Sequence, residues 1–274
     1  MKSQKEIAMM NYGLWSDMEN TTISDLNFHL VQNVLKRSEK LRVSLDYLRR
    51  DFDFFNRSEI FPLDEIERIH VLQLNLDFQQ NLGSSYQIDA SLSPTISSSW
   101  TNALTSEDFL WNFSGFLSKK WMNAKNVSHS LYVGVLYDVL LGSPRYIPSL
   151  QYQTTVLKRT RLDIGFPKNS VAFQFNERNQ VMLEYTFSGM YAHVSNSLQI
   201  DGVGDIVNAK FVQNGSELTL GYDFRIQPNF TTSSKLGYQF INEYEIQDSF
   251  GNQLYDFGRG FSPYFSMGIK YNFK

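Results

Sequence analysis

The chain has no cysteine, few charged side chains and no long apolar run. Without cysteine there is no thiolate metal site, although the redox compartment is only weakly constrained. Charged residues make up 19% of the 274 residues and the mean hydropathy is -0.32. No apolar run reaches the roughly 18 residues that mark a membrane-spanning helix. A formal net charge of -3, without long lysine or arginine runs, argues against nucleic-acid binding.

The sequence does have aromatic residues, at 15%, and recurrent alternation with a period of two. In such alternation, successive side chains lie on opposite faces of a strand. Many predicted strands are about ten residues long, which is the length that a tilted strand needs to cross hydrocarbon. The pattern predicts an all-β fold, a transmembrane antiparallel up-and-down β-barrel. The residues expected to contact lipid include Leu74, Leu76, Leu183, Tyr185, Tyr222 and Phe224.

The connections alternate between short and long, as in barrels with short periplasmic turns and longer external loops. The short set comprises 36–40, 82–85, 123–127, 176–180 and 227–230, and the long set comprises 55–68, 99–108, 140–148 and 245–263. Counting a first strand over 7–15, and one long strand over 205–226 with a bulge near Asn214, gives about 14 strands, with 12 possible. We expect one domain over 1–274, with both termini periplasmic.

Aromatic residues gather near the predicted strand ends, as an interfacial girdle requires. The members of this predicted girdle are Tyr47, Phe52, Phe78, Tyr86, Trp100, Trp111, Trp121 and Tyr271.

The last strand carries the most specific pattern. Its apolar stripe resembles the terminal β-signal by which bacterial outer-membrane proteins are recognised for assembly, and it consists of Phe265, Met267, Ile269, Tyr271 and Phe273. Lys274 departs from that signal, because an aromatic residue usually ends the chain. The first eleven residues have no apolar core for a signal peptide, so we expect a leader to have been removed.

A wider resemblance spans most of the chain. The turn at 158–160, the segment 161–185 with Phe166, Pro167 and Lys168, and the long loop before the last strand are together similar to an uncharacterised outer-membrane barrel family, a domain of unknown function, of Bacteroidetes-type bacteria. The resemblance implies a bacterial outer-membrane barrel in contact with lipid and lipopolysaccharide, inserted by the barrel assembly machinery. It implies no activity and no functional residues.

Catalytic, metal and cofactor sites are not evident. The sequence has no G-x-S-x-G elbow and no HExxH motif, and its four histidines are scattered. The strongest catalytic candidate is His193 with Asp201 or Asp205, although a solvated loop histidine is the simpler interpretation. Asp248, Asn252 and Asp256 lack the spacing of a calcium loop, and a solvated acidic loop explains them better. We therefore expect no cofactor, no metal and no enzyme.

Charged residues are predicted on the lumen face, at Arg42, Asp46, Asp77, Asp138, Glu184, Asp223, Arg225 and Lys270. They fit either a polar channel that selects by charge or a set of internal ion pairs.

Three functions remain open at this stage. The first is a structural or accessory subunit of an envelope complex, which binds other outer-membrane proteins through its outer wall or its long loops. The alternative is a passive, porin-like channel for small solutes, because about 14 strands enclose more space than eight. A barrel enzyme is the weakest of the three.

Overall fold

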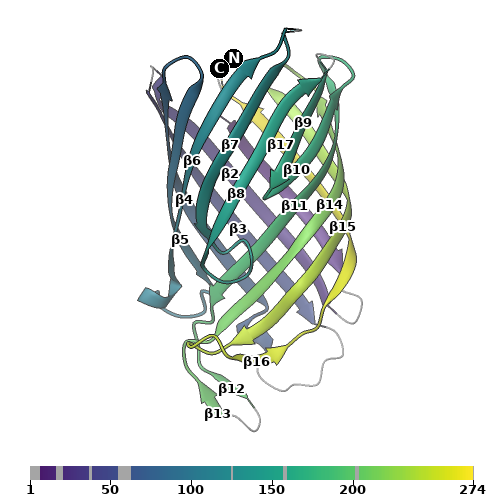
Figure 1. Cartoon of the computed structure of the whole chain (residues 1–274). Helices are drawn as coiled ribbons and strands as arrows, with labels where there is room; N and C mark the ends of the chain where they lie inside the picture. Colours follow the sequence, from purple (N-terminus) through teal and green to yellow (C-terminus); the bar gives the residue numbers. More distant parts are fainter. Residues whose placement is uncertain are drawn as a thin grey trace.

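The computed structural model describes residues 7–16, 21–36, 39–54, 63–124, 126–156, 159–200 and 204–273. Fourteen antiparallel strands form a closed ring, which Figure 1 shows from the side. They are β1 (Ile7–Ser16), β2 (Thr21–Lys36), β3 (Glu39–Phe54), β4 (Arg68–Leu82), β5 (Tyr86–Ser98), β6 (Phe109–Met122), β7 (Ser128–Asp138), β8 (Arg145–Val156), β9 (Thr160–Phe166), β10 (Lys168–Gln174), β11 (Asn179–His193), β14 (Lys210–Arg225), β15 (Phe230–Gln247) and β17 (Gly260–Asn272).

Five smaller elements lie outside the ring. Strand β16 (Gln253–Asp256) adds to the edge of β15, and β12 (Leu198–Ile200) pairs with β13 (Gly204–Ile206) in a separate hairpin. The 3-10 turns η1 (Leu63–Glu65) and η2 (Ser106–Asp108) precede β4 and β6.

The last strand closes the ring, as the sequence predicts. β17 pairs with β15 from Tyr271↔Phe230 to Gly260↔Ile241, and with β1 from Asn272↔Ile7 to Tyr264↔Trp15. Closure removes the sheet edges whose unpaired backbone groups would be costly in lipid.

The outer wall is apolar because alternate residues point outward. Leu220 on β14 is 54% exposed, and Leu74, Leu183, Tyr222 and Phe224 are also exposed on the outer surface. The apolar stripe of β17 has the same orientation, with Phe265, Met267 and Ile269 exposed. This exterior is that of a membrane-spanning barrel, and the predicted lipid-facing side of these strands is confirmed.

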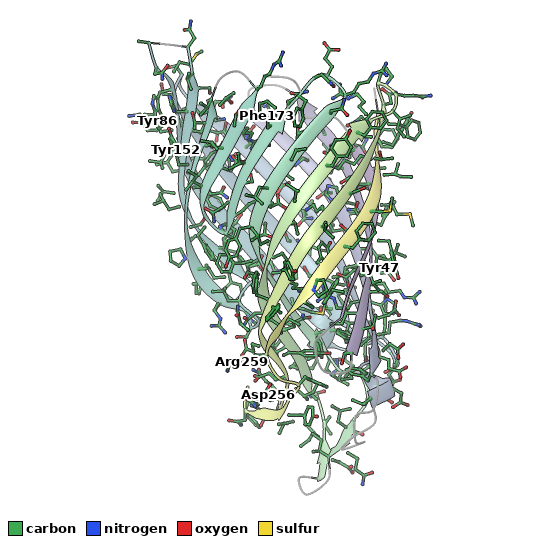
Figure 2. The ribbon with its side chains drawn as sticks, turned by 90° about the vertical axis from the view of Figure 1, so that its right-hand side faces the viewer. Tyr47, Tyr86, Tyr152, Phe173, Asp256 and Arg259 are labelled. Atoms are coloured by element: carbon green, nitrogen blue, oxygen red, sulfur yellow. The ribbon has the colours of Figure 1, made fainter. Side chains whose placement is uncertain are left out.

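The two ends of the barrel differ. Both termini lie at one end, here called the terminal end, together with the short turns (Figure 1). The opposite end, here called the loop end, carries η1, η2, β16 and the β12–β13 hairpin. Figure 2 shows Tyr86, Tyr152 and Phe173 toward the terminal end, and Asp256 and Arg259 toward the loop end.

Some predicted boundaries and roles were wrong. β14 begins at Lys210 rather than at 205, because β13 is a separate strand, although the predicted bulge is present as a register shift at Asn214. The loops predicted at 140–148 and 245–263 are shorter, since β8 begins at Arg145 and β15 extends to Gln247.

One predicted girdle residue lies inside the barrel: Phe52 is a buried member of an apolar core. Nearness to a strand end does not reveal the face on which a side chain lies. Tyr47 is on the outward face of β3, which also carries the exposed Leu45, and its hydroxyl contacts His70. Most of the predicted loop 55–68 lies outside the described residues.

Candidate functional site: the barrel lumen

At the loop end, an apolar core, here called the plug, fills the lumen. Phe52 on β3 and Phe211 on β14 lie on well-separated strands of the ring, yet their ring centroids are 5.1 Å apart. The ring centroid of Tyr244 lies 5.4 Å from that of Phe211 and 4.4 Å from that of Phe257. The plug is completed by buried residues of several strands and loops, namely Trp15, Ile23, Ile66, Ile69, Met190, Ala192, Val194, Leu198, Ile200, Ala209, Ile241 and Ile246. Because these side chains meet across the lumen, the plug fills the space between the strands that carry them.

A charged cluster adjoins the plug. The Arg50 guanidinium donates to both carboxylate oxygens of Asp25, at 2.8 and 2.7 Å, and to the Gln213 side-chain oxygen at 2.6 Å. The same guanidinium lies 4.7 Å from the Trp15 ring. A buried charge needs such partners, because an unpaired one is strongly destabilising. Arg50 therefore ties β2, β3 and β14 together across the lumen.

Cavities lined by described residues lie in the rest of the lumen, and four of them are here called A to D. Cavity A, of about 410 Å³, lies between β1–β6 and the end of β7, and cavity B, of about 270 Å³, lies beside β14, β15 and β17. Cavities C and D measure about 450 and 300 Å³. Neighbouring cavities share lining residues: Asn11 and Asn27 line both A and B, Gln180 lines both B and C, and Gln151 lines both C and D. Side chains thus leave a series of adjoining spaces in the lumen.

Ion pairs line these spaces. Arg42 lies 2.8 Å from Asp77, Lys270 lies 3.1 Å from Asp223, and Lys235 lies 3.0 Å from Glu184, which also contacts Lys168. The predicted lumen charges Asp46 and Asp138 line cavity A, where Asp46 contacts His29. Arg225, on the same strand face as Asp223, is exposed at the terminal rim. The structure therefore combines the two alternatives of the sequence analysis, since paired charges line open space.

The wall is interrupted beside β11. The pairing of β10 with β11 ends at Lys168↔Thr186, and the pairing of β9 with β8 ends at Phe166↔Leu150. β11 nevertheless continues along β14 to His193↔Lys210, and His193 pairs in parallel with Ser98 of β5. Residues 187–193, here called the crossing segment, thus bypass the ends of β6 to β10. Figure 1 shows β11 running diagonally past the β7–β8 hairpin toward the loop end.

Residues 139–143, between β7 and β8, form a lid over the crossing segment. Gly189 has no room for a side chain, because a Cβ there would lie 2.0 Å from the Val139 carbonyl oxygen. The Asn214 amide donates to the Leu141 carbonyl at 3.3 Å, and Gly142, with φ of 91°, turns the lid. The lid lies on the face of β11 that carries Gly189, opposite the face whose Met190 joins the plug.

A polar latch fixes the end of the crossing segment. His193 Nδ1 lies 2.8 Å from Asp108, and Lys210 lies 2.8 Å from Glu107, so that η2 holds both β11 and β14. Burial raises the pKa of Asp108, but hydrogen bonds from Ser98, Thr105 and His193 outweigh it and leave the pKa below its usual value. The pKa of Glu107 is lowered by its hydrogen bond from Lys210.

The predicted chemical candidates have other roles. The carboxylate beside His193 is that of Asp108, not Asp205, and Asp201 lies outside the described residues. Asp248 accepts hydrogen bonds from the backbone and side chain of Asn252, and Asp256 accepts one from the Gly258 backbone, so both carboxylates stabilise turns. Within the described ranges, no group of three or more His, Asp or Glu side chains is arranged to hold a metal ion.

Sequence reasoning missed the plug, the lid and the latch. One available signal was the loss of alternation in 192–194 and 209–212, where neighbouring residues are all buried. Such two-sided burial indicates a strand covered on both faces. The latch gave no local signal, because Asp108 and His193 are separated by 85 positions.

Three solved structures are similar to this chain over nearly its whole length. The NanC porin shares 7% identity at a TM-score of 0.44, with 97% of this chain and 100% of that chain covered. The COG4313 outer membrane channel from Pseudomonas putida F1 shares 11% at a TM-score of 0.43, with 98% and 96% covered. LpxR from Salmonella typhimurium shares 8% at a TM-score of 0.43, with 97% and 100% covered.

A comparison with curated proteins finds no match. In the part of the chain that the structure describes, no helix is long and apolar enough to cross a membrane. One family model matches residues 25–272, which is most of the barrel. The chain therefore belongs to the family described as Domain of unknown function (DUF6268).

Proposed function

We propose that this barrel lies in the bacterial outer membrane, with its terminal end facing the periplasm, and provides a passage for small molecules. The observation that supports this most strongly is the series of adjoining cavities, A to D, through the part of the lumen that the plug leaves free. The short turns at the terminal end support the orientation.

The charges of the lumen support passage of polar groups. Lys168, Lys235 and Lys270 surround cavity B together with Glu184 and Asp223, so the wall offers both donors and acceptors. Such a lining replaces part of the hydration of a passing solute, and its charges bias which ions pass. The plug makes the loop-end mouth narrow, so wild-type ion conductance should be low.

Permeation tests this function. Purified, folded barrel in proteoliposomes should release small tracers faster than empty vesicles do, and tracers larger than the cavities should be retained. If the folded barrel releases no tracer of any size, the proposal that it provides a passage for small molecules is contradicted.

An accessory role is the second candidate. The β12–β13 hairpin extends beyond the barrel wall in Figure 1, and Phe250, in the loop before β16, is 89% exposed. Exposed apolar side chains at a loop tip are suited to binding another envelope protein. Affinity purification from native membranes would support this role by recovering a stoichiometric partner that is lost on Phe250→Ser, whereas recovery of the barrel alone would argue against it.

We further propose that the barrel is not an enzyme. His193, the strongest catalytic candidate in the sequence, is only 3% exposed and is engaged in the latch. A substrate therefore has little access to its ring. Purified barrel should show no hydrolysis of generic ester and peptide substrates above that of a His193→Gln variant.

A further inference from the structure

We infer that cavity A receives small, uncharged amphipathic molecules from the lipid side, through an entrance between the crossing segment and the lid. This inference rests on the proposed function and names its substrate class and route. Gly189 and Tyr191, on the lid-facing side of β11, line cavity A together with Val139 at the start of the lid. The cavity therefore reaches the junction between the crossing segment and the lid, beyond the last ladder pair of β10 with β11 at Lys168↔Thr186.

Aromatic side chains lie on the outer wall beside the opening. The outer face of the neighbouring strands carries Trp111 and Phe113 on β6 and Tyr146 on β8, which is 69% exposed. Phe113 and Tyr146 have ring centroids 5.9 Å apart, in a cluster that also includes Tyr137. Aromatic side chains of this kind mark the boundary between hydrocarbon and water. The lid, which follows directly after β7, therefore lies at the outer boundary of the membrane.

The opposite side of the opening is also apolar. The tip of the β9–β10 hairpin places the Phe166 ring 4.9 Å from Phe187 at the start of the crossing segment. Ile164 and Val171 are exposed on the outer wall of that hairpin. A molecule dissolved in the outer leaflet therefore meets apolar side chains on both sides of the opening. A charged molecule does not dissolve there, because a charge in hydrocarbon is costly.

The lining of cavity A fits such a molecule. Met9, Leu48 and Val71 supply apolar surface, and Asn27 and Gln73 supply hydrogen-bonding groups on the same walls. A volume of about 410 Å³ lies within the range of small-molecule sites. The chemical class is thus a ring or short hydrocarbon body with one or two hydrogen-bonding groups, of the size of a substituted phenol. From cavity A it reaches cavity B past the shared residues Asn11 and Asn27.

The lid controls this entrance. Because Gly189 contacts the lid backbone directly, Gly189→Ala pushes residues 139–143 away from β11. Asn214→Ala removes the amide that holds the Leu141 carbonyl, and loosens the lid by a different route. Gly115→Ala is a matched control on the outer wall of β6, where a Cβ meets nothing within 4 Å.

The test uses thiol labelling, because the natural chain has no cysteine. Gln73→Cys places a thiol in cavity A, and Gln153→Cys places one in cavity C. Each barrel in proteoliposomes is treated with N-phenylmaleimide or with N-(4-carboxyphenyl)maleimide, which differ by one charge. Each labelling rate is divided by the rate of the same reagent with free cysteine. At position 73, the corrected rate of the uncharged reagent should be about tenfold higher than that of the charged reagent, since the lipid route excludes the carboxylate.

Gly189→Ala and Asn214→Ala should each raise the rate at position 73, and Gly115→Ala should leave it unchanged. Three results would overturn the lipid-side entrance. They are equal rates of the two reagents at position 73, no labelling at that position, and a labelling rate that neither lid variant changes. The thiol at position 153 separates the two proposals. If the charged reagent labels it, the terminal end is open and the proposed passage stands even when the lateral entrance fails, whereas no labelling there counts against the passage itself.

Discussion

The two halves of the lumen are built from the same alternating strands, yet one is packed and the other is hollow. At the loop end, the inward residues Phe52, Phe211 and Tyr244 meet across the barrel. Toward the terminal end, the inward residues include Lys168, Glu184 and Lys235, which pair along the wall and leave cavities. The difference shows that alternation determines which face points inward, whereas the size and charge of the inward residues determine whether the interior is filled.

The largest expected effect concerns closure, on which both halves depend. Phe273→Asp places a charge at the end of the β17 stripe, and should remove most of the folded protein from the outer membrane if that stripe is the assembly signal. Lys274→Ala, beyond the stripe, should have little effect. Heat-modifiable gel mobility of membrane fractions measures the folded barrel, and equal insertion of Phe273→Asp and wild type would contradict the signal.

The packed half is expected to respond next. Phe211→Ala leaves a cavity in the plug and should cost about 3 to 5 kcal/mol of unfolding free energy, as large-to-small changes of aromatic core residues do. It should also raise ion conductance in planar bilayers. Phe265→Ala on the exposed outer face of β17 serves as the control and should do neither. Unchanged conductance in a folded Phe211→Ala barrel would show that the plug does not limit axial passage.

The hollow half should respond in selectivity. Glu184→Gln removes the carboxylate that pairs with Lys168 and Lys235, and should cost about 1.5 to 3 kcal/mol, the usual contribution of charged hydrogen bonds. The two uncompensated lysines should shift the reversal potential in a salt gradient toward anion preference. The reversal potential is measured in the Phe211→Ala background, where the current is sufficient. A shift toward cation preference would contradict the assignment of Glu184 as the partner of the two lysines.

The latch should give the smallest effect near neutral pH. The pKa of Asp108 lies below its usual value in the folded barrel, so its stabilising contribution is complete above the unfolded value of about 3.9 and is lost as the pH falls through the lower folded value. Acrylamide quenching of Trp100, which lies between β5 and η2, should therefore stay constant from pH 8 to 5 and increase only in stronger acid. Asp108→Asn should show, at every pH, the stronger quenching that wild type shows only in acid. An increase in quenching between pH 8 and 6 in wild type would show that a group other than Asp108 controls the latch.

Much of this fold could be predicted from the sequence because the determining pattern is local. The stripe of Met267 and Ile269 on the last strand, and that of Leu183 on β11, each identify an outward face without knowledge of any partner strand. Closure of the ring then follows from the cost of an open edge in lipid.

The candidate site could not be predicted in the same way, because its contacts are between distant segments. The lid depends on Gly189 meeting Val139, and the plug depends on Phe52 meeting Phe211. The crossing segment arises because β9 and β10 have only seven residues each beside a fifteen-residue β11, a mismatch that only the register reveals.

The measurement that tests the lumen as a route most directly is the release, from proteoliposomes, of a small polar tracer that empty vesicles retain. Gly221 lines cavity B, and a Cβ there makes only ordinary contacts, so Gly221→Trp can obstruct that cavity within a folded barrel. Release should be faster through wild type than through Gly221→Trp, and release through the variant should be close to that of empty vesicles. Equal release through folded wild type and folded Gly221→Trp would contradict the proposal that the lumen is the route.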